Sequence, residues 1–183
     1  VEPLALQSGQ VRKEHYAYEK FGSCALLAAI EPLTGRRLGQ VHPQRTKREY
    51  ALFFQALADQ FPKAKKIRVV QDNLNTHDTS AFYENMPADE AQALAERFEF
   101  YFTPKSASWL NMIEIEFSAL SRECLDRRIP TLEQLEKEVL TLVTERDAKK
   151  IKIQWQFSIQ SARSKLNSHY TAVHEDNKKF KET

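Results

Sequence analysis

The sequence has little cysteine, no excess of charge of one sign and no long apolar run. Only Cys24 and Cys124 are present, without a Cys-x-x-Cys or a paired Cys/His spacing, so neither a disulfide framework nor a zinc site is supported. Lys and Arg number 27 against 25 Asp and Glu, which by itself makes no strong case for nucleic acid. No run reaches the roughly 18 apolar residues of a membrane span, and no charged-then-apolar leader opens the chain. We therefore expect a cytoplasmic protein without a membrane partner.

The length of 183 residues is enough for one domain with a full hydrophobic core. We expect this domain to span residues 1–170 and to be followed by a polar tail over residues 171–183. The opening Val1-Glu2-Pro3-Leu4 resembles a loop inside a protein more than a translated N-terminus. The sequence is accordingly interpreted as a fragment.

Hydrophobic periodicity predicts an alternation of strands and helices. We expect a hairpin of 23–30 with 37–42, a helix over 46–60, a strand over 67–72, helices within 79–97 interrupted at Pro87, a strand over 98–102, a helix from 110 to about 127, a helix after Thr131, and a segment around 155–170 that packs back on the domain. This order is compatible with a ribonuclease-H-like α/β sheet. It is equally compatible with several other α/β folds.

The run Ile67-Arg68-Val69-Val70-Gln71 delivers Asp72 to a turn that contains Asn73 and His77. Open α/β sheets place their chemistry at the carboxyl ends of the strands, where a carboxylate can hold a metal. The alternative is a turn-forming or helix-capping Asx pair, which is common after strands.

Two further acids, Glu114 and Glu116, fall near the start of the helix expected from residue 110. At about 100° per residue they flank its apolar stripe on opposite sides, so only one of them can point toward the end of the Asp72 strand. Periodicity does not choose between them. Both could instead be solvated glutamates favoured by the helix dipole.

The loop over residues 103–114 carries hydroxyls, a lysine, a tryptophan and Asn111, which is the chemistry of a surface that contacts a phosphate backbone. Each basic residue could instead lie on a solvated face, and Trp109 could belong to the core. The DNA-contact candidates are Lys105, Ser106, Trp109, Arg127 and Arg128.

Three separated blocks resemble the DDE transposases of bacterial insertion sequences in the mariner-like superfamily. They are Gln71-Asp72-Asn73-Leu74-Asn75-Thr76-His77, Ser108-Trp109-Leu110-Asn111-Met112-Ile113-Glu114 and Arg122-Glu123-Cys124-Leu125-Asp126-Arg127-Arg128-Ile129-Pro130. The resemblance implies a ribonuclease-H-like mixed sheet with flanking helices, in which three carboxylates bind two Mg²⁺ or Mn²⁺ ions. It maps the second acid onto Asp72 and the third, in an Asn-x-x-Glu element, onto Glu114 rather than Glu116.

The same resemblance implies cleavage and strand transfer of double-stranded DNA at transposon ends and target, by a homodimer in the bacterial cytoplasm that is nucleoid-associated when bound to DNA. Asn73, His77 and Asn111 would be secondary site residues. The family's first acid lies on a core strand ahead of the hairpin, where this chain has not yet begun, so we expect the fragment alone to be inactive. A non-catalytic DNA-binding or dimerisation remnant, or another ribonuclease-H-like nuclease such as a junction resolvase, remains an alternative.

Overall fold

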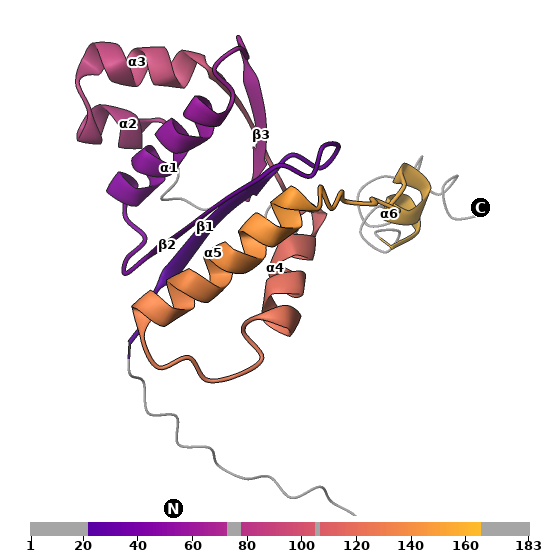
Figure 1. Ribbon diagram of the computed structural model, residues 1–183. Helices are drawn as coiled ribbons and strands as arrows, with labels where there is room; N and C mark the ends of the chain where they lie inside the picture. Colours follow the sequence, from indigo (N-terminus) through magenta and orange to yellow (C-terminus); the bar gives the residue numbers. More distant parts are fainter. Residues whose placement is uncertain (1–21, 73–77, 105–106, 166–183) are drawn as a thin grey trace, which may run out of the picture.

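The computed structural model describes residues 22–72, 78–104 and 107–165 (Figure 1). Their elements follow the predicted order closely. They are β1 (Ala25–Ile30), β2 (Arg37–His42), α1 (Lys47–Gln60), β3 (Ile67–Gln71), α2 (Ser80–Asn85), α3 (Ala88–Glu96), β4 (Phe98–Phe102), the 3-10 helix η1 (Ser108–Leu110), α4 (Ile113–Glu123), α5 (Leu132–Ala148) and α6 (Ile159–Lys165).

The predicted hairpin is confirmed and forms the centre of the molecule. β1 and β2 pair antiparallel, and their turn is closed by hydrogen bonds from the Gly35 amide to the Glu31 carbonyl (2.9 Å) and from the Glu31 amide to the Arg36 carbonyl (2.8 Å). Gly35 has a φ of +83°, and a Cβ there would meet the Lys150 carbonyl carbon at 2.8 Å. Only glycine therefore fits this turn, both for its backbone conformation and for its contact with the chain after α5.

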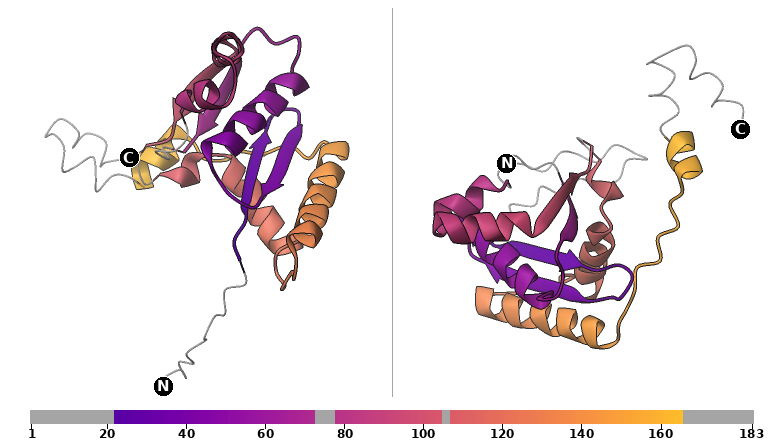
Figure 2. Two further views of the ribbon diagram at one scale, coloured as in Figure 1. Left: turned by 90° about the vertical axis from the view of Figure 1, so that its left-hand side faces the viewer. Right: turned by 90° about the horizontal axis from the view of Figure 1, so that it is seen from above.

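Side chains on the two faces of the hairpin belong to two different hydrophobic clusters. The register pairs Ala29 with Leu38 on one face and Leu26 with Val41 on the other. The first face packs on α1, α2 and α3, and the second packs on α4 and α5. The left view of Figure 2 shows α1 on one side of the hairpin and α5 on the other. Because alternate side chains of each strand point to opposite faces, the hairpin forms the middle layer between two layers of helices.

The second strand pair, β3 with β4, is parallel, with Ile67 opposite Phe98 and Gln71 opposite Phe102. One of its faces completes the α1–α3 cluster through Val69, Phe98 and Phe100. Among the described residues the two strand pairs form separate two-stranded sheets. Mixed α/β architecture with small sheets and flanking helices, consistent with a ribonuclease-H-like fold, is confirmed.

Two helix boundaries were predicted well and one was not. Pro87 separates α2 from α3 as expected, and the Thr131 hydroxyl caps α5 by accepting from the Gln134 amide at 3.2 Å. The helix expected from 110 to about 127 is shorter, because Asn111 has an extended backbone and the chain leaves helical geometry at Cys124.

The segment after α5 returns to the domain only in part. The Ile153 amide donates to the Pro32 carbonyl at 3.2 Å, whereas α6 has no buried residue and stands apart at the right of Figure 1. The expectation that this whole segment packs back is therefore wrong for α6. No helix in the described ranges combines the length and the apolarity needed to cross a membrane.

Candidate metal and DNA site

Asp72 is exposed and directly follows β3. The Thr103 amide donates to the Gln71 carbonyl at 2.9 Å, which extends the parallel pairing one step beyond β4 and brings Thr103 beside Asp72. Position 72 is thus at the carboxyl end of a parallel strand, as predicted.

Asn111 connects the start of α4 to the same strand. Its side-chain Nδ2 donates to the carbonyl of Val70 at 3.3 Å, and its Oδ1 accepts from the Ile113 amide at 3.2 Å. The Asn111 carbonyl also accepts from the Glu114 amide at 3.1 Å. One side chain therefore holds the first turn of the helix against β3, two residues before Asp72.

Glu114 and Glu116 lie on opposite sides of α4, as the periodicity predicted. Glu114 is exposed in the first turn. Glu116 is only 6% exposed and belongs to the buried side of the helix with Ala119 and Leu120. The alternative of a solvated glutamate is wrong for Glu116.

Glu116 is buried because two arginines surround its carboxylate. Arg37 on β2 donates from Nε and Nη2 to the two carboxylate oxygens, both at 2.8 Å. Arg146 on α5 donates to the same two oxygens at 3.1 and 3.2 Å. Burial raises the pKa of Glu116, but the hydrogen bonds and charges of both guanidinium groups outweigh burial and leave the pKa below its usual value.

The same cluster reaches the chain after α5. Asp147 accepts from the Arg37 amide at 2.7 Å, and the Ile151 carbonyl accepts from Arg37 Nη2 at 2.6 Å. Arg37 thereby joins β2, α4, α5 and the following segment. Because Glu116 is fixed inward by this cluster, the helix can present Glu114 only outward.

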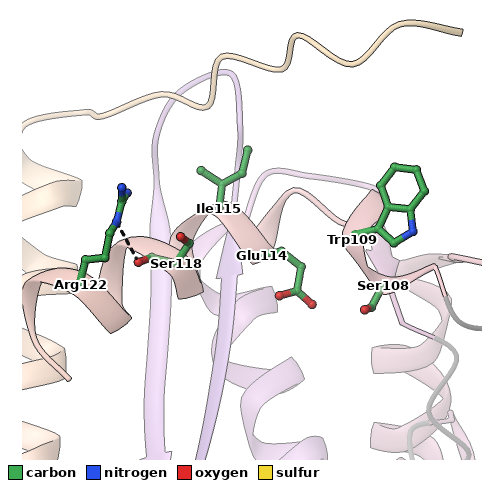
Figure 3. A pocket seen from close by; sticks show the side chains of 6 residues that line it. All are labelled: Ser108, Trp109, Glu114, Ile115, Ser118 and Arg122. Carbon is green, nitrogen blue, oxygen red and sulfur yellow. Dashed lines mark hydrogen bonds between the residues drawn. The ribbon is translucent and has the colours of Figure 1, made fainter. Parts of the chain in front are cut away.

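A shallow cavity of about 350 Å³ lies along the outward face of α4 (Figure 3). It is lined by Ser108, Trp109, Glu114, Ile115, Ser118 and Arg122. The predictions from sequence included Trp109 and Glu114 but missed Ser118 and Arg122. Their spacing of four and eight residues after Glu114 was the available signal, since it places all three on one helix face.

The predicted DNA contacts have different surroundings. Trp109 is 42% exposed, with its ring edge-on to Phe157 at a centroid distance of 5.1 Å, so it is not a core residue. Arg127 pairs with Glu138 at 2.6 Å, whereas Arg128 is exposed and forms no ion pair within the described ranges. The predicted residues Asn73, His77, Lys105 and Ser106 lie outside the described residues.

The donor set fits a hard divalent cation, although incompletely. Asp72 and Glu114 are exposed carboxylates, which form no ion pair within the described part of the chain, and Mg²⁺ prefers such oxygen ligands. The Thr103 hydroxyl beside Asp72 is buried and has no hydrogen-bond partner among the described residues, so it could accept or donate a bond at this strand end. The described residues contain no group of three potential metal ligands.

A search of the curated proteins and a search of the solved structures gave no significant match. A family model described as DDE superfamily endonuclease matches residues 2–136, which is more than half of the chain. The match includes both Asp72 and the first turn of α4. Endonucleases of this superfamily act on DNA and generally use divalent metal ions. A strand-end aspartate, a tethered helix and this match lead to one assignment: the chain belongs to the DDE superfamily endonucleases.

Proposed function

We propose that this chain is the catalytic core of a transposase of the bacterial insertion-sequence type, in which Asp72 and Glu114 hold divalent metal for DNA cleavage and strand transfer. The observation that carries the proposal is the hydrogen bond from Asn111 to the Val70 carbonyl, which brings the start of α4 against the strand that ends at Asp72. The buried Glu116 supports it, because its two arginines turn Glu114 toward solvent.

Metal at this position would supply Lewis-acid activation of the attacking oxygen and stabilisation of the leaving oxygen, as paired Mg²⁺ or Mn²⁺ ions do in other phosphoryl-transfer enzymes. Asp72 and Glu114 would provide carboxylate ligands from two separate elements. Asn111 would keep the two elements at a fixed separation. Asn73 and His77 follow Asp72 in sequence and would orient the scissile phosphate.

The substrate in this proposal is double-stranded DNA at transposon ends and target, and a homodimer would bring two ends together. The proposed DNA contacts are Lys105, Ser106, Trp109, Arg127 and Arg128. Of these, Arg127 already has a carboxylate partner, so it is the weakest candidate among the described residues.

The proposal is tested in the full-length protein, with labelled transposon-end DNA and Mg²⁺ or Mn²⁺. We expect Asp72→Asn and Glu114→Gln each to abolish cleavage while DNA binding is retained, because each removes a metal ligand and no DNA contact. Glu136→Gln, an exposed acid on α5, is the matched control and should cleave normally.

Three outcomes would contradict the proposal or part of it. Full cleavage by either ligand variant would exclude that residue as a ligand. Hydrolysis of the labelled end without its joining to target would favour a resolvase-type nuclease. If instead a folded Glu116→Gln variant were inactive and Glu114→Gln active, the third acid would be Glu116.

A further inference from the structure

The cavity along α4 combines three kinds of chemistry on one exposed surface. Glu114 stands at the first turn of the helix, and Ser118 and Arg122 follow at intervals of four residues. Trp109 and Ile115, 42% and 41% exposed, add an apolar wall. Figure 3 shows Arg122 and Trp109 at opposite ends of this surface, with Glu114 between them.

Arg122 differs from Arg127 and Arg146 in the partners of its guanidinium group. Arg127 and Arg146 both pair with carboxylates. The Nε of Arg122 donates to the Ser118 carbonyl at 3.3 Å within α4, and Arg122 forms no ion pair in the described ranges. Its Nη groups therefore remain able to bind an anion in the planar, two-pronged manner that suits phosphate.

The spacing of these groups matches a DNA strand. Eight helical residues from Glu114 to Arg122 correspond to about 12 Å along the helix axis. Phosphates of one strand advance by about 3.4 Å each along a duplex. A strand that runs along α4 would therefore place about three nucleotides between Glu114 and Arg122. An exposed indole is a surface on which a base or a deoxyribose can pack.

From this arrangement we infer that the α4 cavity binds the DNA strand that flanks the cleavage position, with Arg122 on a backbone phosphate and Trp109 against an unpaired base. The inference rests on the proposed function and assigns two strand contacts to it. Arg122 and Trp109 act in positioning DNA. They leave the metal ligands to Asp72 and Glu114.

The test measures DNA binding by fluorescence anisotropy without divalent metal, so that the result does not depend on the metal site. The probes are a short duplex with a 3′ single-stranded overhang and the same duplex with a blunt end. Arg122→Ala should weaken binding of both probes by about tenfold, as expected for one charge-assisted hydrogen bond. It should also reduce the salt dependence by about one phosphate contact.

Matched variants separate charge, geometry and general basicity. Arg122→Lys should recover part of the affinity, because the charge remains while the planar fork is lost. Lys137→Ala removes an exposed lysine on α5 that does not line the cavity, and should leave binding unchanged. Trp109→Ala should weaken binding of the overhang probe more than that of the blunt probe, and Trp109→Phe should restore the difference.

An independent readout uses the two tryptophans of the chain. In a Trp155→Phe background the remaining indole is Trp109, and its fluorescence should be quenched when the overhang probe binds. Unchanged fluorescence, or an Arg122→Ala effect no larger than that of Lys137→Ala, would overturn the inference. If Asp72→Asn loses Mn²⁺ binding but these DNA-binding tests fail, the inference alone is overturned. If Mn²⁺ binding is unchanged in Asp72→Asn and Glu114→Gln, the proposed function is overturned instead.

Discussion

At the scale of single residues, Glu114 and Glu116 have the same side chain, two positions apart, in opposite surroundings. Glu116 lies between the guanidinium groups of the buried Arg37 and the partly buried Arg146, and Glu114 faces solvent. Glu116→Gln would leave Arg37 without a carboxylate and Arg146 with only Glu123 at 3.3 Å, and breaking a buried pair typically costs about 3–5 kcal/mol. Glu114→Gln should change the free energy of unfolding by less than about 0.5 kcal/mol. Urea unfolding of the two variants measures both values, and equal values would contradict the roles assigned to them.

The lowered pKa of Glu116 also predicts how stability depends on pH. In the folded chain the pKa of Glu116 lies below 4.5, its ordinary value. The ionised carboxylate therefore stabilises the fold above that pH, and this contribution is lost as the pH falls through the folded pKa. We expect the free energy of unfolding to fall in acid less steeply in Glu116→Gln than in the wild type. High salt should leave this difference in place, because it screens exposed ion pairs far more than buried ones. A difference that disappears in high salt would assign the acid sensitivity to surface carboxylates.

Periodicity indicated that only one of the two glutamates can point toward the end of the Asp72 strand, but not which, because both flank the apolar stripe. Only the family resemblance favoured Glu114. The deciding contact joins Arg37 to Glu116 across 79 residues, and no local pattern in a sequence marks such a pair. Asp72 was different. Its position followed from a short β-branched strand and a following turn, which are local features.

At the scale of elements, the start of α4 depends on Asn111. Its side chain donates to β3 through Nδ2 and accepts from the Ile113 amide through Oδ1, and these two contacts can be separated by substitution. Asn111→Ala removes both, whereas Asn111→Ser keeps an acceptor for the helix amide without the donor to β3. Because the donor sets the distance of α4 from the Asp72 strand, both variants should bind Mn²⁺ several-fold more weakly.

The two variants should differ in stability. Asn111→Ala should lower the free energy of unfolding by about 1 kcal/mol through loss of its two side-chain hydrogen bonds, and Asn111→Ser should lower it less. Electron paramagnetic resonance of free Mn²⁺ gives the affinity and urea unfolding gives the stability. Wild-type Mn²⁺ affinity in Asn111→Ala would show that the contact with Val70 does not position the site.

Most element boundaries were predictable because capping residues and prolines are local signals. Pro87 and Thr131 mark breaks that the structure reproduces. The first turn expected around Leu110 instead forms η1, since Asn111 uses its side chain to bind β3 and adopts an extended backbone. That interaction spans 41 residues, so helix propensity alone could not have predicted the later start of α4.

At the scale of the whole molecule, the segment after α5 contacts the hairpin at its start but not through α6. The Ile151 carbonyl accepts a hydrogen bond from Arg37, and the Ile153 amide donates one to the Pro32 carbonyl. α6, by contrast, buries no residue. Ile159 of α6 is 71% exposed, so Ile159→Ala should change the free energy of unfolding by less than about 0.5 kcal/mol.

Truncation after Lys150 is the comparison, because it removes the two contacts to the hairpin. It should cost about 1–3 kcal/mol, the penalty for leaving a buried donor without its acceptor. Urea unfolding of both variants decides the point. A large loss in Ile159→Ala would show that α6 does pack on the domain, as the sequence had suggested.

The central claim is that Asp72 and Glu114 bind one shared metal site, and Fe²⁺-directed cleavage of the protein backbone tests it most directly. Fe²⁺ that replaces Mg²⁺ generates hydroxyl radicals in the presence of ascorbate and peroxide, and these cut the backbone next to the bound ion. We predict cuts near both residue 72 and residue 114, with both cuts lost together in Asp72→Asn and in Glu114→Gln and retained in Glu136→Gln. A cut near residue 114 that survives Asp72→Asn, or cuts confined to one of the two segments, would contradict the account.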